Sequence, residues 1–341
     1  MTWDRVRVLI LLLDTVPLVL ISEQFRGAHV QVDVLVAAPA KGIGMTISLF
    51  VNLLLNGLAM GMVYAMLGIG LILLIRAVGI LNFAQGDLLM LGAFITSSLI
   101  LDFELPIYVM IPLAFLMFIL IGALFMFVVY WPLRKASYPA ATIIATMGAS
   151  IMLKESVTLI WGSVPRALPS IITDAEGRTG ILYLGTVPIQ WQYILIVLVG
   201  ILFIVGITLL FDKLYIGKLM QAACQDAYAA NLLGIPSQLT ILLTYIIVAV
   251  VAGFGGYMVA PIYMVRNTLG TLQLRAFAGV VIGGLGSISG ALIGSLIVGV
   301  VEVFSTMYLS SYKDVTVFIL LILFLIFRPQ GIFGERIGDK A

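Results

Sequence analysis

Hydrophobic residues in this chain are gathered into long runs, which short polar segments separate. The runs are 45–75, 80–100, 106–131, 139–161, 191–211, 239–262, 276–304 and 315–327. A helix needs roughly 20 apolar residues to cross a bilayer. The pattern therefore predicts an all-α polytopic membrane protein with about eight transmembrane passes.

The run at 276–304 predicts a broken helix. As one straight helix it would measure about 43 Å, which is longer than a single span requires. The sequence GGLGSISG at 283–290 interrupts it. We expect two helical pieces joined at this break, because irregular backbone at membrane depth is tolerated only where it faces protein or a cavity.

Lysine and arginine near the ends of the runs predict orientation, because they favour the cytoplasmic side of a membrane. They lie at Arg76, Arg134–Lys135, Lys213 with Lys218, and in the tail from Arg328. We place all these sites and the C-terminus in the cytoplasm, and the loops at Asp102 and 162–190 outside. Three tryptophans also fall at predicted span ends, as interfacial anchors do: Trp131, Trp161 and Trp191.

This orientation predicts an inverted-topology repeat. The segment that begins at residue 45 starts outside, whereas the segment that begins at 239 starts inside. A similar set of passes and half-passes follows each start. In transporters built this way, the substrate path lies at the interface between the repeats.

The first 44 residues leave several interpretations open. Residues 8–22, VLILLLDTVPLVLIS, are apolar, but Asp14 and Pro17 interrupt them. They could be a signal-like segment, a ninth span, or a leader from an over-long start. We treat 1–44 as an N-terminal extension, 45–335 as the transmembrane domain, and 336–341 as a cytoplasmic tail.

Composition agrees with a membrane protein along the whole length. Of 341 residues, 62% are hydrophobic and 10% charged, and the mean hydropathy is +1.20. A single cysteine, Cys224, excludes an intrachain disulfide, and with a single histidine, His29, it disfavours a His/Cys metal site. No Walker A, H-E-x-x-H or G-x-S-x-G motif occurs. Energy, if the protein uses any, must therefore come from another subunit or from an ion gradient.

The stretch LNFAQGD at 81–87 places polar residues inside an apolar region. Asn82, Gln85 and Gly86 share one helical face. Asp87 is expected near the cytoplasmic start of its span, shortly after Arg76. It is either a helix-start carboxylate beside the positive end of the helix dipole or part of a polar lining of the substrate path.

Two further features have a structural interpretation. NGLAMG at 56–61 and GALIG at 290–294 are both G-x-x-x-G patterns, which allow close helix packing. Glu302 lies in an apolar run, and we expect it near the outer interface, where it reaches water. Its alternative role is that of an ion-coupling carboxylate.

Residues 212–238 form the longest predicted cytoplasmic segment. Apolar side chains mix with polar ones there, and Gly234 with Pro236 supplies a helix stop. We expect a short helix that is too polar to span. It is a surface helix, a linker, or a helix that docks into a groove on a cytoplasmic partner.

At these residues the sequence resembles the permease subunits of branched-chain amino acid ABC transporters, of the LivH-like kind. The resemblance covers about 45–335 and keeps its blocks in order. These blocks are LLLNGLAMGMVYAMLGIGLILLI, GILNFAQGDLLMLGAF, AACQDAYAANLLGI, FAGVVIGGLGSISGALIGSLIVGVVE and FRPQGIFG.

The resemblance implies a multi-pass importer subunit of the bacterial inner membrane, which is not itself an enzyme and has no cofactor. Its partners would be a second homologous permease, two cytoplasmic ATPases that use the ATP, and an external substrate-binding protein. No nucleic acid is implied. The substrate path would include Asn56, Asn82, Gln85, Gly86, Asp87, Gly283, Gly284, Gly286, Ser287 and Gly290. ATPase coupling would fall to Ala223, Cys224, Gln225, Asp226, Ala229, Ala230, Leu233 and Gly234.

Two departures from the family pattern stand out. The family usually has His at the position of Gln85 and Glu at that of Asp87, and the loss of an imidazole argues against a proton relay. Residues 1–44 have no counterpart in the usual shorter form. The substrate stays open between branched-chain or other hydrophobic amino acids, urea, short amides and organic acids. A secondary transporter that uses Asp87 or Glu302 is the alternative mechanism, and no catalytic cluster supports a lipid-modifying enzyme.

Overall fold

The computed structural model describes residues 47–134, 139–173, 179–184, 187–308 and 312–333. The predictions for 1–44 and for the tail 336–341 lie outside these residues. In chain order the elements are α3 (Ile47–Val78), α4 (Gln85–Leu101), α5 (Ile107–Phe125), the π-helical turn η1 (Met126–Tyr130), α6 (Trp131–Leu133), α7 (Pro139–Trp161), β1 (Ile181–Leu184), β2 (Val187–Gln190), α8 (Trp191–Lys213), α9 (Tyr215–Gln225), α10 (Ala227–Leu232), α11 (Ser237–Tyr263), the 3-10 turn η2 (Leu269–Thr271), α12 (Leu272–Gly283), α13 (Ile288–Tyr308) and α14 (Lys313–Phe327).

The prediction of an all-α polytopic membrane protein is confirmed. Among the described residues, 6 helices are long and apolar enough to cross a membrane, and three shorter apolar helices accompany them. The shorter ones lie at Gln85–Leu101, Leu269–Gly283 and Asp314–Phe327. Trp131, Trp161 and Trp191 stand at the ends of helices, as their role as anchors predicts.

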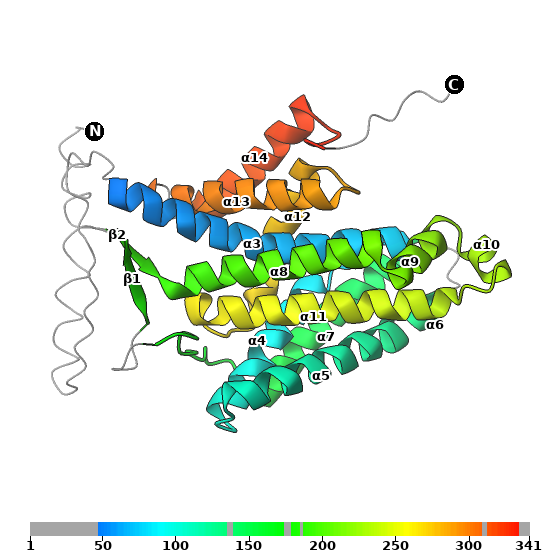
Figure 1. Cartoon of the computed structure of the whole chain (residues 1–341), viewed down its shortest axis with the longest axis horizontal. Coiled ribbons are helices and arrows are strands. Elements are labelled where there is room, and N and C mark those ends of the chain that lie inside the picture. Colours follow the sequence, from blue (N-terminus) through cyan, green and yellow to red (C-terminus); the bar gives the residue numbers. More distant parts are fainter. Residues whose placement is uncertain (1–46, 135–138, 174–178, 185–186, 309–311, 334–341) are drawn as a thin grey trace, which may run out of the picture. The chain divides into compact units, whose positions relative to one another are not determined.

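Helix α3 lies at the centre of the permease domain. It packs against α8, α11, α12 and α13 (Figure 1). Its inner stretch is apolar on every side, which is typical of a helix that other helices surround. A Cβ on Gly57 or Gly61 would come within 2.7 Å of the α13 backbone. The G-x-x-x-G pattern is therefore a helix-packing site, as predicted.

The predicted break in 276–304 is confirmed. Helix α12 ends at Gly283, and Gly284 and Gly286 then adopt φ values of 111° and 104°, which L side chains rarely adopt. The chain after α14 returns to this point, where the Ile332 and Phe333 N–H groups donate to the Ile282 and Gly283 carbonyls at 2.9 Å. These bonds satisfy carbonyls that the helix end leaves free.

Helices α4 and α12 both begin partway along α3. The Gln85 amide lies against Gly70, and Gly70 precedes the end of α3 at Val78 by about 12 Å of helix. Residues 79–84 therefore turn back along α3 before α4 starts. Helix α12 spans about 18 Å, which is roughly half a bilayer core. Both α4 and α12 thus start inside the helical bundle.

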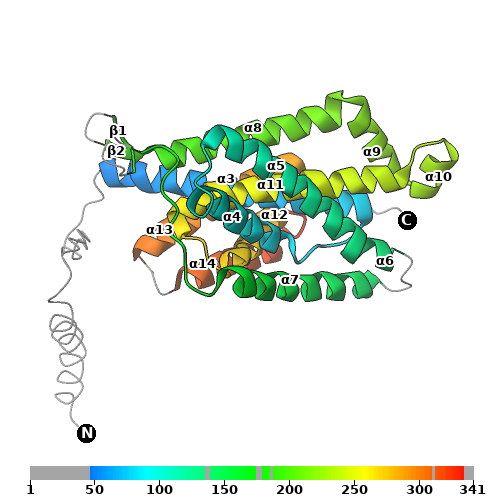
Figure 2. The ribbon, with the colours of Figure 1, turned by 90° about the horizontal axis from the view of Figure 1, so that it is seen from below.

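The two halves of the chain, α3–α7 and α11–α14, pack against each other reciprocally. Helix α3 packs on α12 and α13, and α11 packs on α4 and α5. Figure 1 shows α3 and α11 side by side and running in opposite directions. This arrangement is what an inverted-topology repeat of α3–α7 and α11–α14 produces. The β1–β2 hairpin lies at one end of the helices and α9–α10 at the other (Figure 2).

Candidate functional site

The starts of α4 and α12 meet at a polar junction. The Gly86 N–H donates to Gln273 Oε1 at 2.5 Å, and Gln273 Nε2 donates to the Asn82 carbonyl at 2.8 Å. A Cβ on Gly86 would collide with the Gly270 carbonyl, so only glycine allows this approach. Both helices have their N-terminal ends, and hence the positive ends of their dipoles, at this junction.

Several polar atoms at the junction are buried and have no hydrogen-bond partner among the described residues. They are Asn82 Nδ2, both polar atoms of Gln85, and Asp87 Oδ1. Asn82 and Asp87 are 2% exposed and Gln85 is 0% exposed. An unsatisfied buried group costs about 1–3 kcal/mol. Orphaned atoms concentrated in this way indicate a place where water or a ligand binds.

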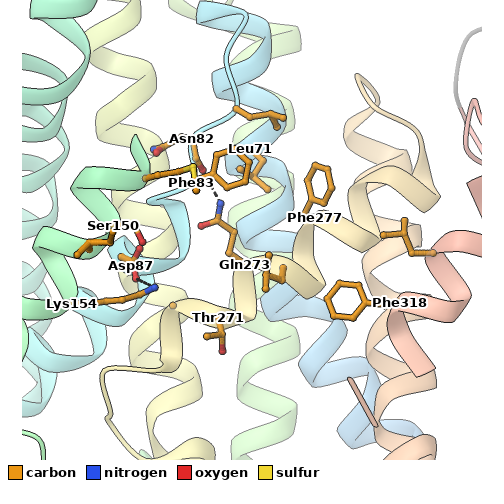
Figure 3. Close-up of a pocket in the computed structure, with 16 residues that line it drawn as sticks. Leu71, Asn82, Phe83, Asp87, Ser150, Lys154, Thr271, Gln273, Phe277 and Phe318 are labelled. Atoms are coloured by element: carbon orange, nitrogen blue, oxygen red, sulfur yellow. Dashed lines mark hydrogen bonds and ion pairs between the residues drawn. The ribbon is translucent and has the colours of Figure 1, made fainter. Parts of the chain in front are cut away.

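Asp87 faces Lys154 and Ser150 of α7 (Figure 3). Its Oδ1 lies 3.6 Å from Lys154 Nζ, and the lysine side chain is 37% exposed whereas the aspartate side chain is 2% exposed. Asp87 is in the first turn of α4, as predicted. It is buried because residues 79–84 carry the chain back along α3 before α4 begins. Asp87 is therefore both a helix-start residue and a residue that lines a cavity.

The cavity has a volume of about 460 Å³ and lies between α7 on one side and α12 with α14 on the other. Its polar edge consists of Asn82, Asp87, Ser150, Lys154 and Gln273. Figure 3 shows Phe277 and Phe318 on the opposite side from Asp87 and Lys154. Its apolar lining comes from Leu71, Leu81, Phe83, Met147, Ile151, Leu274, Phe277, Phe318 and Leu321.

The structure does not bring all the predicted path residues together. Asn82 and Asp87 line the cavity, and Gln85 and Gly86 lie beside it in the junction. Asn56 lines a separate cavity of about 270 Å³ beside Tyr263 and Thr306. The other predicted path residues lie at or beside the α12–α13 turn, where Arg76 donates to the Gly286 carbonyl. They are Gly283, Gly284, Gly286, Ser287 and Gly290.

Sequence reasoning missed four polar residues of the cavity, namely Ser150, Lys154, Thr271 and Gln273. Lys154 carried a usable signal, because a cation inside an apolar run of spanning length normally faces a partner or a cavity. Ser150 lies one helical turn before Lys154 and shares its face. Gln273 precedes the apolar run at 276–304, and only the fold shows that it turns inward.

The expectation that Glu302 reaches water is wrong. Its side chain is 3% exposed, and Oε1 lies 2.8 Å from Arg275 Nε. The Tyr64 hydroxyl donates to Oε2 at 2.5 Å. Arg275 also forms an ion pair with Asp314. Glu302 can therefore stay buried, because a cation and a hydroxyl replace the water that it loses.

The predicted coupling segment contains two helices instead of one. The chain bends at Asp226, whose Oδ1 accepts hydrogen bonds from the Tyr228 and Ala229 N–H groups at 2.9 and 3.0 Å and so caps α10. Gly234 ends the segment with a φ of 80°. Both helices lie at the end of the bundle opposite the hairpin (Figures 1 and 2).

The coupling candidates differ in exposure. Ala223 and Ala230 are buried, Cys224 is half-buried, and the rest are exposed: Gln225, Asp226, Ala229, Leu233 and Gly234. Burial raises the pKa of the Cys224 thiol, although the positive charge of Arg76 opposes this shift. Tyr228, Leu232 and Leu233 are 75%, 72% and 81% exposed and give α10 an apolar outer surface.

No cluster of three or more His, Cys, Asp or Glu residues that could hold a metal ion occurs in the part of the chain that the structure describes. The chemistry of the junction is therefore that of amide groups, one hydroxyl and one pair of opposite charges. Such groups bind and orient a polar ligand. They do not form a nucleophile–base arrangement.

Comparisons with known proteins agree with this architecture. Residues 53–327 match the family model described as "Branched-chain amino acid transport system / permease component". The chain is 35% identical over 303 residues to the high-affinity branched-chain amino acid transport system permease protein BraD of Pseudomonas aeruginosa, covering 86% of this chain and 98% of that protein. It is 32% identical, with the same coverage, to LivH of Escherichia coli K12.

A more distant relative comes from an archaeon. The probable branched-chain amino acid transport permease protein LivH of Methanocaldococcus jannaschii is 28% identical over 280 residues, covering 79% of this chain and 88% of that protein. No solved structure matches. The family match spans most of the permease domain, including both helices of the junction, α4 and α12. This chain therefore belongs to the family of branched-chain amino acid transport permease components.

Proposed function

We propose that this chain is the transmembrane permease subunit of an ABC importer that moves branched-chain or other hydrophobic amino acids into the cell. The observation that carries the proposal is the family match over residues 53–327. Transport proceeds by alternating access, and ATPases on the cytoplasmic side drive it. The chain itself supplies a path and needs no cofactor of its own.

The proposal includes partners. A second permease of the same family completes the path, two ATPases bind at the cytoplasmic face, and an external binding protein delivers substrate. Supporting the ATPase contact, α10 presents three exposed apolar side chains beyond the bundle, Tyr228, Leu232 and Leu233. A short helix with an exposed apolar face is suited to a groove on a partner. On this basis the chain resides in the bacterial inner membrane with its C-terminus in the cytoplasm.

The apolar lining of the 460 Å³ cavity supports a hydrophobic amino acid over urea or a short amide. A small polar solute gains nothing from aromatic and aliphatic walls, whereas a branched side chain loses its contact with water there. The experiment is to reconstitute the full importer in proteoliposomes and to measure ATP-dependent uptake with a panel of leucine, isoleucine, valine, urea and an organic acid.

Uptake of the branched-chain amino acids alone is the expected result. Uptake of urea or the organic acid in preference would overturn the substrate assignment. If the chain without ATPases moved substrate under an ion gradient, the importer mechanism would be wrong. A matched control is the complex with a partner ATPase that binds ATP but cannot hydrolyse it, which should show no uptake.

A further inference from the structure

One edge of the cavity holds a negative and a positive group side by side. Asp87 is almost fully buried, and its Oδ1 lies 3.6 Å from Lys154 Nζ, which is too long for a hydrogen bond. The same oxygen has no hydrogen-bond partner among the described residues, and neither has the neighbouring Asn82 Nδ2. Both atoms belong to residues that line the cavity, and neither is satisfied by the described part of the chain.

Resting on the proposed function, we propose that this edge binds the charged head group of an α-amino acid during transport. Asp87 Oδ1 accepts hydrogen bonds from the ammonium group. Lys154 Nζ and Asn82 Nδ2 donate to the carboxylate. The positive ends of the α4 and α12 dipoles lie beside these donors and also favour a carboxylate there.

The charge balance of the edge selects the class of ligand. Asp87 and Lys154 carry opposite charges, so the pair is neutral as a whole. A zwitterion can pair its ammonium group with Asp87 and its carboxylate with Lys154. An organic acid would meet Asp87 with like charge, and an amino acid amide would lack the carboxylate that Lys154 and Asn82 require. Urea could form hydrogen bonds there, but it would leave the apolar walls unfilled.

The opposite walls suit an apolar side chain. Phe277 and Phe318 stand across the cavity from Asp87 and Lys154 (Figure 3). With the head group held at the polar edge, a branched side chain extends toward these rings. A volume of about 460 Å³ falls in the range of small-molecule sites, roughly 300–1,000 Å³. Residues of α4, α7, α12 and α14 together would therefore contact both the head group and the side chain of the substrate.

The first test uses Asp87→Asn and Lys154→Gln in the complete importer with its ATPases and binding protein. Each variant should lose roughly tenfold or more of leucine uptake, because one charge-assisted hydrogen bond to the head group is removed. ATPase stimulation by the loaded binding protein should persist. That split between transport and hydrolysis would not arise from a purely structural role. Glu155→Gln, an exposed neutralisation on the same helix, serves as the control and should leave uptake unchanged.

The second test reads occupancy directly. Ser150→Cys places a thiol at the polar edge, and its labelling by a methanethiosulfonate reagent is measured by peptide mapping as the excess over the parent chain, which retains Cys224. Leucine should slow this labelling, whereas 4-methylpentanoate, leucinamide and urea should not. Val164→Cys, in the loop after α7 and 77% exposed, should label equally with and without leucine.

The outcomes separate this inference from the proposed function. If the parent complex fails to import leucine with ATP, the proposed function and this inference fall together. If it imports leucine, but Asp87→Asn and Lys154→Gln transport normally, only the head-group site is refuted. Equal protection of Ser150→Cys by 4-methylpentanoate or urea would also refute it, because the site would then ignore one or both charges.

Discussion

Arg275 holds two carboxylates from different helices, and the more deeply buried one is Glu302. Tyr64 on α3 and Arg275 on α12 contact Glu302, which itself lies on α13, so the cluster connects three helices within the bundle. An ion pair of this kind adds little net stability, since burial removes water from both charges. Loss of one partner is costly, because the other charge stays buried.

Replacing Arg275 with methionine should therefore lower the free energy of unfolding by about 3–5 kcal/mol. Glu302→Gln should cost less, since the neutral amide can still accept a hydrogen bond from Tyr64. The measurement is chemical or thermal unfolding of the purified permease in detergent. Arg166→Met is the matched control. Its pair with Asp102 is exposed, so its loss should change stability by less than about 1 kcal/mol. Equal losses for both arginine variants would contradict this prediction.

Asp102 gives a pH dependence at the end of α4. Hydrogen bonds from Ser98 and Arg166, with the positive charge of Arg166, lower the pKa of this carboxyl in the folded protein. Its stabilising effect is therefore complete above the unfolded pKa of about 3.9 and is lost as the pH falls through the lower folded value. Trp161 can report the change, because its Nε1 donates to Ser98 Oγ at 2.5 Å.

The emission of Trp161, measured in a variant whose other tryptophans are phenylalanine, should stay constant from neutral pH to about pH 4 and shift only in stronger acid. Asp102→Asn should abolish this titration. A shift that begins near pH 6 in the parent would contradict the sign of the pKa change.

At the scale of elements, α10 depends on its cap. It has only 6 residues, and the Asp226 side chain accepts both of the cap hydrogen bonds at its N-terminus. Asp226→Ala should destabilise this helix by about 0.5–2 kcal/mol, whereas Asp226→Ser should retain most of the cap. If α10 docks on an ATPase, the alanine variant should bind the ATPase more weakly and the serine variant nearly normally. Co-purification of the two proteins measures this, and unchanged binding by a Leu232→Asp, Leu233→Asp double variant would refute the docking role.

The sequence predicted those elements whose signals are local. The glycines of 283–290 marked the break between α12 and α13, and tryptophans marked helix ends. The inward turn before α4 was not predicted, although Asn82, Gln85 and Asp87 interrupt the apolar run 80–100, because this turn depends on the contact of Gly86 with Gly270. For the same reason the pairing of Asp87 with Lys154 and the burial of Glu302 were not predictable. Each depends on packing between distant helices.

At the scale of the whole molecule, the two repeats, α3–α7 and α11–α14, contain the same kind of ion pair with the charges reversed. Helix α4 begins Gln85–Gly86–Asp87, and α12 contains Gln273–Leu274–Arg275 at its start. Asp87 pairs with Lys154 on α7, and Arg275 pairs with Asp314 on α14. In an inverted repeat these helices are counterparts. The same position thus carries an acid in one half and a base in the other, and each is held by the corresponding outer helix.

Exchanging the two charges of the Asp87–Lys154 pair separates a structural role of the pair from a role in substrate recognition. The double variant Asp87→Lys, Lys154→Asp keeps one charge of each sign at the junction, so it should assemble better than Asp87→Lys alone. It also places a cation beside the buried start of α4, where the helix dipole disfavours it, and reverses the polarity presented to the cavity. Leucine uptake should therefore stay lost although the complex forms. The exchange Asp102→Arg, Arg166→Asp, at the exposed pair, is the control and should transport normally. Restored uptake in the Asp87–Lys154 exchange would show that the pair only holds α4 against α7 and does not orient the substrate.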